Sequence, residues 1–248
     1  MHHIHFDTID STNTFAKKLV AGRDAKNAEP ILITAEEQTE GRGRSGKTFS
    51  SLRGNGLYMS VVLPINRMPQ DSLFITTAAA VAVCEVLREC GCQGAEIKWV
   101  NDIYLDDRKI CGILTEAVTD PDSGIMRFAV VGIGINVDAD ERRFPKDIIG
   151  KAAAVTGLYV KKDQLAVRIA DRLIRRVKRS LTVEDERRET LNRYREMSMI
   201  IGREVYWEEN GRERRGLAVD IDDEAALIVD TGRGEAKLQS GYISISFR

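Results

Sequence analysis

The chain has 248 residues, of which 43% are hydrophobic, and its 37 Lys and Arg residues nearly balance 38 Asp and Glu residues. This composition is typical of a folded protein with a sizeable core, large enough for one large domain and a small one. A net charge near zero provides no overall field that would attract nucleic acid or an anionic membrane. No apolar stretch approaches the roughly 18 residues that span a bilayer, and the N-terminus lacks the apolar core of a signal peptide. We therefore expect a cytoplasmic protein without a membrane or nucleic-acid partner.

The first half of the chain alternates strands with helices. Its periodicity predicts a strand at 4–10, a helix at 15–20, strands at about 30–36 and 57–63, and a helix from Asp71 to Cys90. Ser11, Thr12 and Asn13 directly precede the first helix, where such side chains act as an N-cap. The second helix is expected to face the core and to end at Gly91.

Short β-rich runs follow at 97–100, 102–105, 109–118 and 127–137. Turn residues separate them, so we expect antiparallel hairpins rather than crossover helices. From Lys162 to about Met197 the pattern is helical and heavily charged, and it carries one apolar stripe. The fold class is therefore α+β with a mixed sheet.

The composition changes near residue 198. Beyond it, about five short strands with Gly-rich turns and an Asn210-Gly211 hairpin signal predict a small β-barrel. We expect a domain at 1–197 and a small barrel domain at 198–248.

The cysteines and histidines give little support to a metal centre or to histidine catalysis. The four cysteines are Cys84, Cys90, Cys92 and Cys111, and none forms a C-x-x-C pair, so we expect reduced thiols. His2, His3 and His5 lie at the terminus without acidic or cysteine partners, which argues against a metal site. The chain has no other histidine, so the chemistry must depend on Lys, Arg, Asp or Asn, or on a metal held by phosphates.

The segment 36–48, EEQTEGRGRSGKT, is the strongest candidate site in the chain. Its glycines permit close backbone approach, and Arg42 and Arg44 offer planar charged groups for carboxylate or phosphate oxygens. Gly41 to Thr48 also matches the Walker A pattern. However, a polar spacer precedes this match, and a glycine-containing segment and then a strand follow it, whereas a phosphate loop opens a helix. We therefore reject the P-loop interpretation.

Five motifs have to be explained together. They are STN at 11–13, EEQTEGRGRSG at 36–46, KWVND at 98–102, DRKICGIL at 107–114 and GIGIN at 132–136. In this order they resemble the biotin protein ligases, over the whole chain from about Ile4. The resemblance implies a fold related to class II aminoacyl-tRNA synthetases, with a small C-terminal barrel. It also implies two reactions: biotin and ATP form biotinyl-AMP, and a lysine of a biotin carboxyl carrier protein or domain then attacks this anhydride.

The resemblance also implies roles for individual residues. Lys109 corresponds to the principal catalytic lysine, and Arg42 and Arg44 can help to hold two anions in attack geometry. The expected biotin-binding residues are Ser11, Thr12, Asn13, Gln38, Gly41, Arg42, Gly43, Arg44, Lys109, Gly112, Ile113, Leu114, Gly132 and Gly134. The expected nucleotide-binding residues are Phe49, Lys98, Asn101, Asp102 and Asn136. Mg²⁺ is expected between the phosphates, without a dedicated set of protein ligands.

The chain departs from the family pattern at two positions. Val100 stands where the family usually has Pro, and Phe49 where it usually has Trp. Phe49 keeps an aromatic face for adenine but lacks the indole donor. Neither change removes a reacting group, so we expect an effect on the affinity for ATP rather than on activity.

Three alternatives remain beside the biotin ligase interpretation. A biotin-responsive repressor is disfavoured because the first motif begins at residue 11, which leaves no room for a winged helix of roughly 60 residues. A non-enzymatic regulator that binds biotin or a nucleotide is disfavoured by the intact Arg42, Arg44 and Lys109. A lipoate ligase or octanoyl transferase shares the fold, but the KWVND and GRGRSG motifs favour biotin. A homodimer is compatible with the sequence, as is a monomer.

Overall fold

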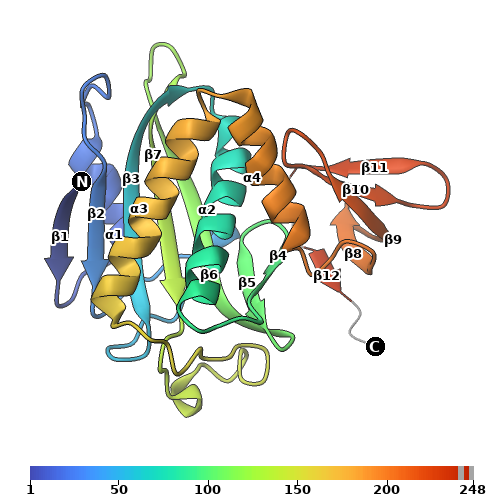
Figure 1. Cartoon of the computed structure of the whole chain (residues 1–248), viewed down its shortest axis with the longest axis horizontal. Coiled ribbons are helices and arrows are strands. Elements are labelled where there is room, and N and C mark those ends of the chain that lie inside the picture. The colour runs from blue at the N-terminus through green and yellow to red at the C-terminus, as the bar shows by residue number, and fades with distance from the viewer. Residues whose placement is uncertain (240–242, 246–248) are drawn as a thin grey trace.

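The computed structural model describes residues 1–239 and 243–245, which form a large sheet with helices and a smaller second sheet (Figure 1). The α-helices are α1 (Thr12–Val20), α2 (Asp71–Glu89), α3 (Lys162–Ser180) and α4 (Glu184–Glu196), and two short 3₁₀ helices are η1 (Arg44–Gly46) and η2 (Glu141–Arg143). The strands of the large sheet are β1 (His2–Phe6), β2 (Ile31–Ala35), β3 (Leu57–Arg67), β4 (Glu96–Lys98), β5 (Asp102–Leu105), β6 (Arg108–Thr119) and β7 (Met126–Ile135). Those of the second sheet are β8 (Glu204–Glu209), β9 (Arg212–Ile221), β10 (Leu227–Asp230), β11 (Glu235–Leu238) and β12 (Ile243–Ile245).

The large sheet is mixed, as the sequence predicted. Its strand order is β1-β2-β3-β7-β6-β5-β4. β1 and β2 are parallel, whereas every other neighbouring pair is antiparallel. The consecutive strands β4 to β7 pair as hairpins because only short turns connect them. One of these turns, between β5 and β6, has positive φ at both Asp106 and Asp107. The α+β fold class is confirmed.

Helices cover the two faces of the sheet unequally. α2, α3 and α4 lie side by side over one face (Figure 1), where Val61 of β3 and Val131 of β7 are buried with α2. The next residue of each strand points to the other side. There Val62 and Val130 pack with Ala16 of α1. α1 has only nine residues, so this second face is only partly covered, and the uncovered part lies beyond the N-terminus of α1.

The helical stretch predicted from Lys162 to Met197 is divided into α3 and α4. The last turn of α3 bonds to the side chain of Thr182, whose Oγ1 lies 3.0 Å from Lys178 O. α4 then begins with Glu184, Asp185 and Glu186 in its first turn, where carboxylates interact favourably with the positive end of a helix. The helical pattern predicted from Lys162 to about Met197 is thus confirmed except at residues 181–183, where the chain leaves the helix.

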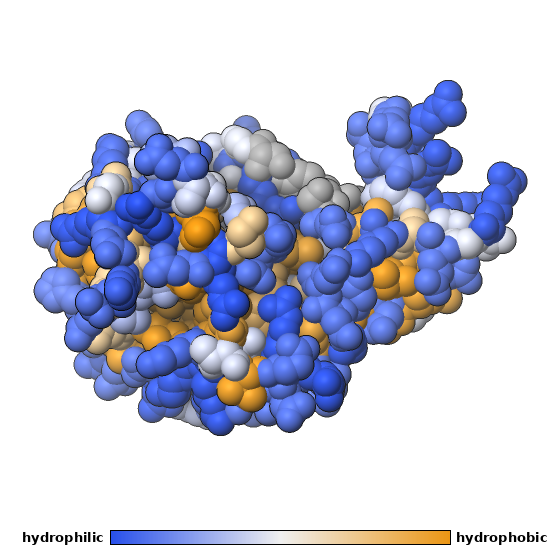
Figure 2. All heavy atoms as spheres, turned by 90° about the horizontal axis from the view of Figure 1, so that it is seen from above, coloured by the Kyte–Doolittle hydropathy of each residue, from blue (hydrophilic) through white to orange (hydrophobic). Residues whose placement is uncertain are grey.

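The second sheet is antiparallel, with the order β11-β10-β9-β8-β12. Asn210 and Gly211 both have positive φ and form the turn between β8 and β9, as their sequence predicted. In Figures 1 and 2 this sheet stands to one side of the large sheet, and hydrophilic residues dominate its outer end. Trp99, which is buried beside β4, donates its indole N–H to Ala225 O at 3.1 Å and so joins the two parts.

The remaining sequence expectations concern the terminus and the membrane. His3 Nε2 and His5 Nδ1 lie 2.8 and 2.9 Å from Thr34 Oγ1, so these imidazoles connect β1 to β2. In the described part of the chain, no helix has both the length and the apolar character needed to cross a membrane. The four cysteines are free and buried.

Candidate active site

The glycines of β7 mark the part of the sheet that α1 leaves uncovered. Phe128 and Val130 of this strand pack in the cluster that contains α1. Because side chains alternate, Gly132 and Gly134 continue the same face, while the isoleucines between and after them are buried in the core that contains α2. The alternation in GIGIN thus separates a core side from an open side. A cavity of about 730 Å³ lies on the open side.

The N-terminus of α1 forms one polar wall of this cavity. Ser11 caps the helix, and its side chain accepts from the backbone N–H of Thr14. Gln38 Oε1 accepts from Thr12 N at 2.9 Å and from Thr12 Oγ1 at 3.1 Å. Gln38 Nε2 donates to Ser51 Oγ at 2.8 Å. This network brings the STN motif and the loop after β2 together although they are distant in sequence.

Asn13 connects α1 to the strands behind it. Its Nδ2 donates to Glu116 Oε2 at 2.9 Å, and its Oδ1 accepts from Ser60 Oγ at 2.6 Å. A Cβ at Gly132 would collide with the Asn13 side chain, so this glycine provides the room that Asn13 needs. Burial raises the pKa of Glu116, but hydrogen bonds from Lys17 and Asn13 outweigh burial and lower it. Glu116 is therefore a stable anion at this wall.

The loop between β2 and β3 covers the cavity without forming a P-loop. Phe49 N donates to Gly41 O at 2.9 Å, and Gly43 N donates to Lys47 O at 2.7 Å, so the loop closes on itself. Extended chain and then β3 follow it, rather than a helix. The ring of Phe49 lies against Gly134, where an added Cβ would be 2.5 Å from Phe49 Cε1. The glycine thus makes space for an aromatic ring on the sheet.

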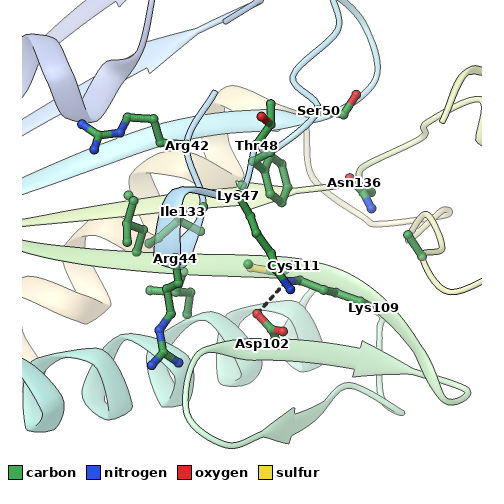
Figure 3. Close-up of a pocket in the computed structure, with 18 of the residues that line it drawn as sticks. Arg42, Arg44, Lys47, Thr48, Ser50, Asp102, Lys109, Cys111, Ile133 and Asn136 are labelled. Atoms are coloured by element: carbon green, nitrogen blue, oxygen red, sulfur yellow. Dashed lines mark ion pairs between the residues drawn. The ribbon is translucent and has the colours of Figure 1, made fainter. Parts of the chain in front are cut away.

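The three predicted catalytic cations each have a protein partner. Lys109 Nζ lies 2.7 Å from Asp102 Oδ1, and Arg44 Nη1 donates to Asn101 Oδ1 at 2.9 Å. Figure 3 shows Lys109 directed at Asp102, while Arg42 extends away from this pair. Arg42 Nη1 lies 3.7 Å from Glu116 Oε1, and its side chain is half exposed. The cations therefore surround the cavity but do not converge on one point in this structure.

The cavity brings together most of the residues that the sequence predicted. Those that line it are Ser11, Thr12, Asn13, Gln38, Arg42, Gly43, Arg44, Phe49, Asn101, Asp102, Lys109, Gly112, Ile113, Leu114, Gly132, Gly134 and Asn136. Gly41 and Lys98 are not among the lining residues. Lys98 Nζ instead lies 5.3 Å from the ring centroid of Tyr104, and burial, with help from the charge of Lys109, lowers its pKa. Asn136 is buried, and its Nδ2 donates to Ala153 O at 2.9 Å.

The structure adds lining residues that the sequence did not predict. One group of them follows η2, namely Phe144, Pro145, Asp147, Ile148, Lys151 and Ala152; the others are Lys47, Thr48, Ser50, Met59, Tyr104, Cys111 and Ile133. The apolar residues in the charged loop 138–152 were the sequence signal that could have identified this part of the lining. Cys111 lies at the floor, and burial raises the pKa of its thiol, so this thiol is not a ready nucleophile.

Comparisons with known proteins agree with this geometry. A profile of the biotin/lipoate A/B protein ligase family matches residues 5–136. The bifunctional ligase/repressor BirA of Bacillus subtilis is 32% identical over 98% of this chain and 74% of its own length. The chain belongs to the biotin/lipoate A/B protein ligase family.

Two further relatives are biotin ligases by name. The biotin–[acetyl-CoA-carboxylase] ligase of Mycobacterium tuberculosis is 29% identical over 93% of this chain and 85% of its own length. The biotin protein ligase of Aquifex aeolicus, solved in complex with biotin and ATP, superposes with a TM-score of 0.79 at 25% identity over 99% of this chain and 98% of its own. This protein is thus a ligase enzyme of the biotin protein ligase type.

Proposed function

We propose that this protein joins biotin to ATP as biotinyl-5′-AMP and transfers the biotinyl group to a specific lysine of a biotin carboxyl carrier protein or domain. One observation carries the proposal: a single cavity is lined by the polar N-terminus of α1, by the glycines of β6 and β7, and by cations from three separate segments. The Aquifex complex with biotin and ATP and the Mycobacterium carboxylase ligase support it.

The polar wall suits the ureido ring of biotin. That ring offers one carbonyl acceptor and two N–H donors, so it needs a mixture of donors and acceptors at the end of an apolar slot. We propose that Ser11, Thr12 and Gln38 provide this mixture. Gly112 and Gly134 are paired across β6 and β7, and the absence of side chains there lets a flat ring approach the sheet.

In the first step, a carboxylate oxygen of biotin forms a bond to the α-phosphorus of ATP, and the bond to the departing pyrophosphate breaks. Both reactants are anions, so cations must hold them within attack distance and stabilise the charge that develops at phosphorus. We assign this task to Lys109, with Arg44 and Arg42 on the covering loop. Each would exchange its present partner for an oxygen of the ligand.

In the second step, the neutral amine of the carrier lysine attacks the carbonyl carbon of biotinyl-AMP. An amide bond forms, AMP leaves, and the amine releases a proton. Mg²⁺ would be held mainly by phosphate oxygens, because it typically binds through one or two carboxylates plus phosphates, and Asp102 and Asp147 are carboxylate residues at the cavity. It would neutralise phosphate charge.

The decisive experiment uses the purified protein with ATP, Mg²⁺ and either biotin or lipoate. Mass spectrometry should detect biotinyl-AMP and pyrophosphate formation with biotin, and no adenylate with lipoate. A carrier domain added afterwards should gain one biotinyl group, and a carrier whose acceptor lysine is replaced by arginine should gain none. Lipoyl-AMP as the main product, or no adenylate with either acid, would refute the proposal.

A further inference from the structure

Lys109 stands at an irregularity of β6. Tyr104 of β5 pairs with Lys109, whereas Ile103 pairs with Cys111, so Ile110 has no opposite residue in β5. Such a bulge turns the local side chains away from the regular alternation. The direction of the Lys109 side chain therefore depends on contacts other than the regular ladder.

Those contacts come from the loop that follows η2. Lys109 N donates to Lys151 O at 2.9 Å, and Ala153 N donates to Lys109 O at 2.9 Å. The segment 151–153 thus forms a short parallel bridge with Lys109. This segment binds both backbone polar groups of the lysine. The position of the segment therefore determines the position of the Lys109 backbone, from which the side chain extends.

Glu141 of η2 lies outside the cavity and binds residues on both sides of the bridge at Lys109. One carboxylate oxygen, Oε2, accepts from Arg108 Nη1 at 2.8 Å, and the other, Oε1, accepts from Ala154 N at 3.0 Å. Arg108 directly precedes Lys109, and Ala154 directly follows Ala153. One carboxylate therefore joins the two backbone segments that are bridged at Lys109. Glu141 is not among the residues that line the cavity.

The 3₁₀ turn that carries Glu141 is itself anchored. Asn55, which is buried, donates from Nδ2 to Asp140 O at 3.3 Å and accepts at Oδ1 from Asp140 N at 3.2 Å. Asn55 lies near the end of the loop that contains Arg42 and Arg44. The residue pair 140–141 is thus bonded to the covering loop, to β6 and to the segment 151–154.

We propose that Glu141 is a positioning residue for Lys109. By holding Arg108 and Ala154 together, its carboxylate keeps the 151–153 segment against the backbone of Lys109 and keeps the ammonium group beside Asp102. The inference rests on the proposed catalytic role of Lys109. It predicts that loss of Glu141 slows adenylation although the residue touches neither substrate.

The first test compares Glu141→Ala, Glu141→Gln and Arg142→Ala in single-turnover pyrophosphate release with both substrates saturating. Glu141→Ala should be about tenfold slower than the wild type, which is about 1.4 kcal/mol in the barrier, with a KM for biotin within about twofold. The rate of Glu141→Gln should lie between those of Glu141→Ala and the wild type. Its amide oxygen can still accept from Ala154 N, while the ion pair with Arg108 is lost. Arg142 is on the same turn, but its side chain is 90% exposed, so Arg142→Ala should match the wild type.

A double-mutant cycle with Lys109→Gln separates positioning from a general loss of structure. If Glu141 acts through Lys109, Glu141→Ala should cause no further loss in the Lys109→Gln background. Equal losses in both backgrounds, or a rate for Glu141→Ala within twofold of the wild type, would overturn the inference. If Glu141→Ala does not fold, Glu141→Gln takes its place in the cycle. A wild-type rate for Lys109→Gln alone would instead overturn the assignment of Lys109, and the inference with it.

Discussion

The ring of Phe49 rests on Gly134, so close that a Cβ at this position would be 2.5 Å from the ring. In the neighbouring strand β6, a Cβ at Gly112 would be 3.3 Å from the same ring. The two glycines are register partners, and together they form a flat surface for an aromatic group. This surface lines the cavity, so the Phe49 ring rests on a surface that a ligand in the cavity would also contact.

Alanine at these two glycines should therefore have different effects. Without a clash, Gly→Ala in a strand would stabilise by roughly 0.5–1 kcal/mol. At Gly134 the clash with the ring should dominate and destabilise by about 1–3 kcal/mol, as expected for overpacking. Gly112→Ala is the matched control and should change the free energy of unfolding by less than about 1 kcal/mol. Urea unfolding of both variants decides this, and equal stabilities would show that the ring does not press on Gly134 in solution.

Lys109→Gln should slow adenylation by roughly 10²–10³, because a preorganised charge next to the reacting phosphate typically contributes about 3–4 kcal/mol. Transfer from preformed biotinyl-AMP should suffer less, since the two anions are then already joined. Single-turnover pyrophosphate release at saturating biotin measures the first effect. A rate within about threefold of the wild type, under about 1 kcal/mol, would exclude Lys109 as the catalytic lysine.

Lys98→Gln provides the comparison for this experiment. Lys98 was predicted to contact the nucleotide, yet it lies outside the cavity lining and above the ring of Tyr104. From this position we expect a change of less than about threefold in the KM for ATP. A much larger rise would restore Lys98 as a nucleotide contact.

Arg44→Gly should release biotinyl-AMP at least about tenfold faster than the wild type. A charge-assisted hydrogen bond is worth about 1.5–3 kcal/mol, and Arg44 lies at the cavity beside Asn101. Arg42→Gly should have a smaller effect, because the half-exposed Arg42 extends toward Glu116. A filter-binding chase with labelled intermediate measures both. Equal rates of biotinyl-AMP release from the wild type and both variants would show that neither arginine helps to retain the intermediate.

Glu85 of α2 makes a pH-dependent contribution to stability. It lies 2.7 Å from Arg176 and 3.0 Å from Arg172, and Arg193 is also in contact with it. Burial raises its pKa, but Arg176 and Arg172 outweigh burial, so its pKa in the folded state is lowered. A lowered folded pKa means that the stabilisation is complete above the unfolded pKa near 4.3 and is lost as the pH falls through the folded value.

Glu85→Gln should therefore destabilise the protein by about 3 kcal/mol at pH 7, and the difference from the wild type should shrink in acid. Glu89→Gln is the control, since Glu89 is 53% exposed and pairs with Arg172 alone among the described residues. It should cost under about 1 kcal/mol. Chemical unfolding at several pH values tests both, and a pH-independent cost of Glu85→Gln would contradict the ionic origin.

The sequence predicted those parts of the fold that depend on local signals. Alternation and turn residues located the hairpins from β4 to β7 and the Asn210-Gly211 turn. The break between α3 and α4 was missed because no Gly or Pro marks it. Its signal was electrostatic, three acidic residues in the first turn of α4.

The same contrast applies to the site. Motifs identified the residues that carry reacting groups or leave room for a ring, because their chemistry is visible in the residue type. The lining residues at 144–152 were not predicted from the sequence. Residues such as Phe144 and Ile148 resemble those of an ordinary apolar loop, and they line the cavity because the chain folds back on Lys109. Their place depends on long-range backbone bonds, which leave no periodic trace in the sequence.

Cutting the chain just before residue 198, the boundary that we propose between the two domains, would remove more than the second sheet. Trp99 would lose the carbonyl of Ala225, and a buried donor without a partner costs about 1–3 kcal/mol. Met199, whose N–H donates to Ile97 O at 2.9 Å, would also be gone. Ile97 N would still donate to Met197 O at 2.7 Å, but the loss of Met199 would leave Ile97 O at the outer edge of β4 open to a strand of another molecule. The affected segment leads directly to Asn101 and Asp102, so the shorter fragment should associate with itself and hold its active site less firmly.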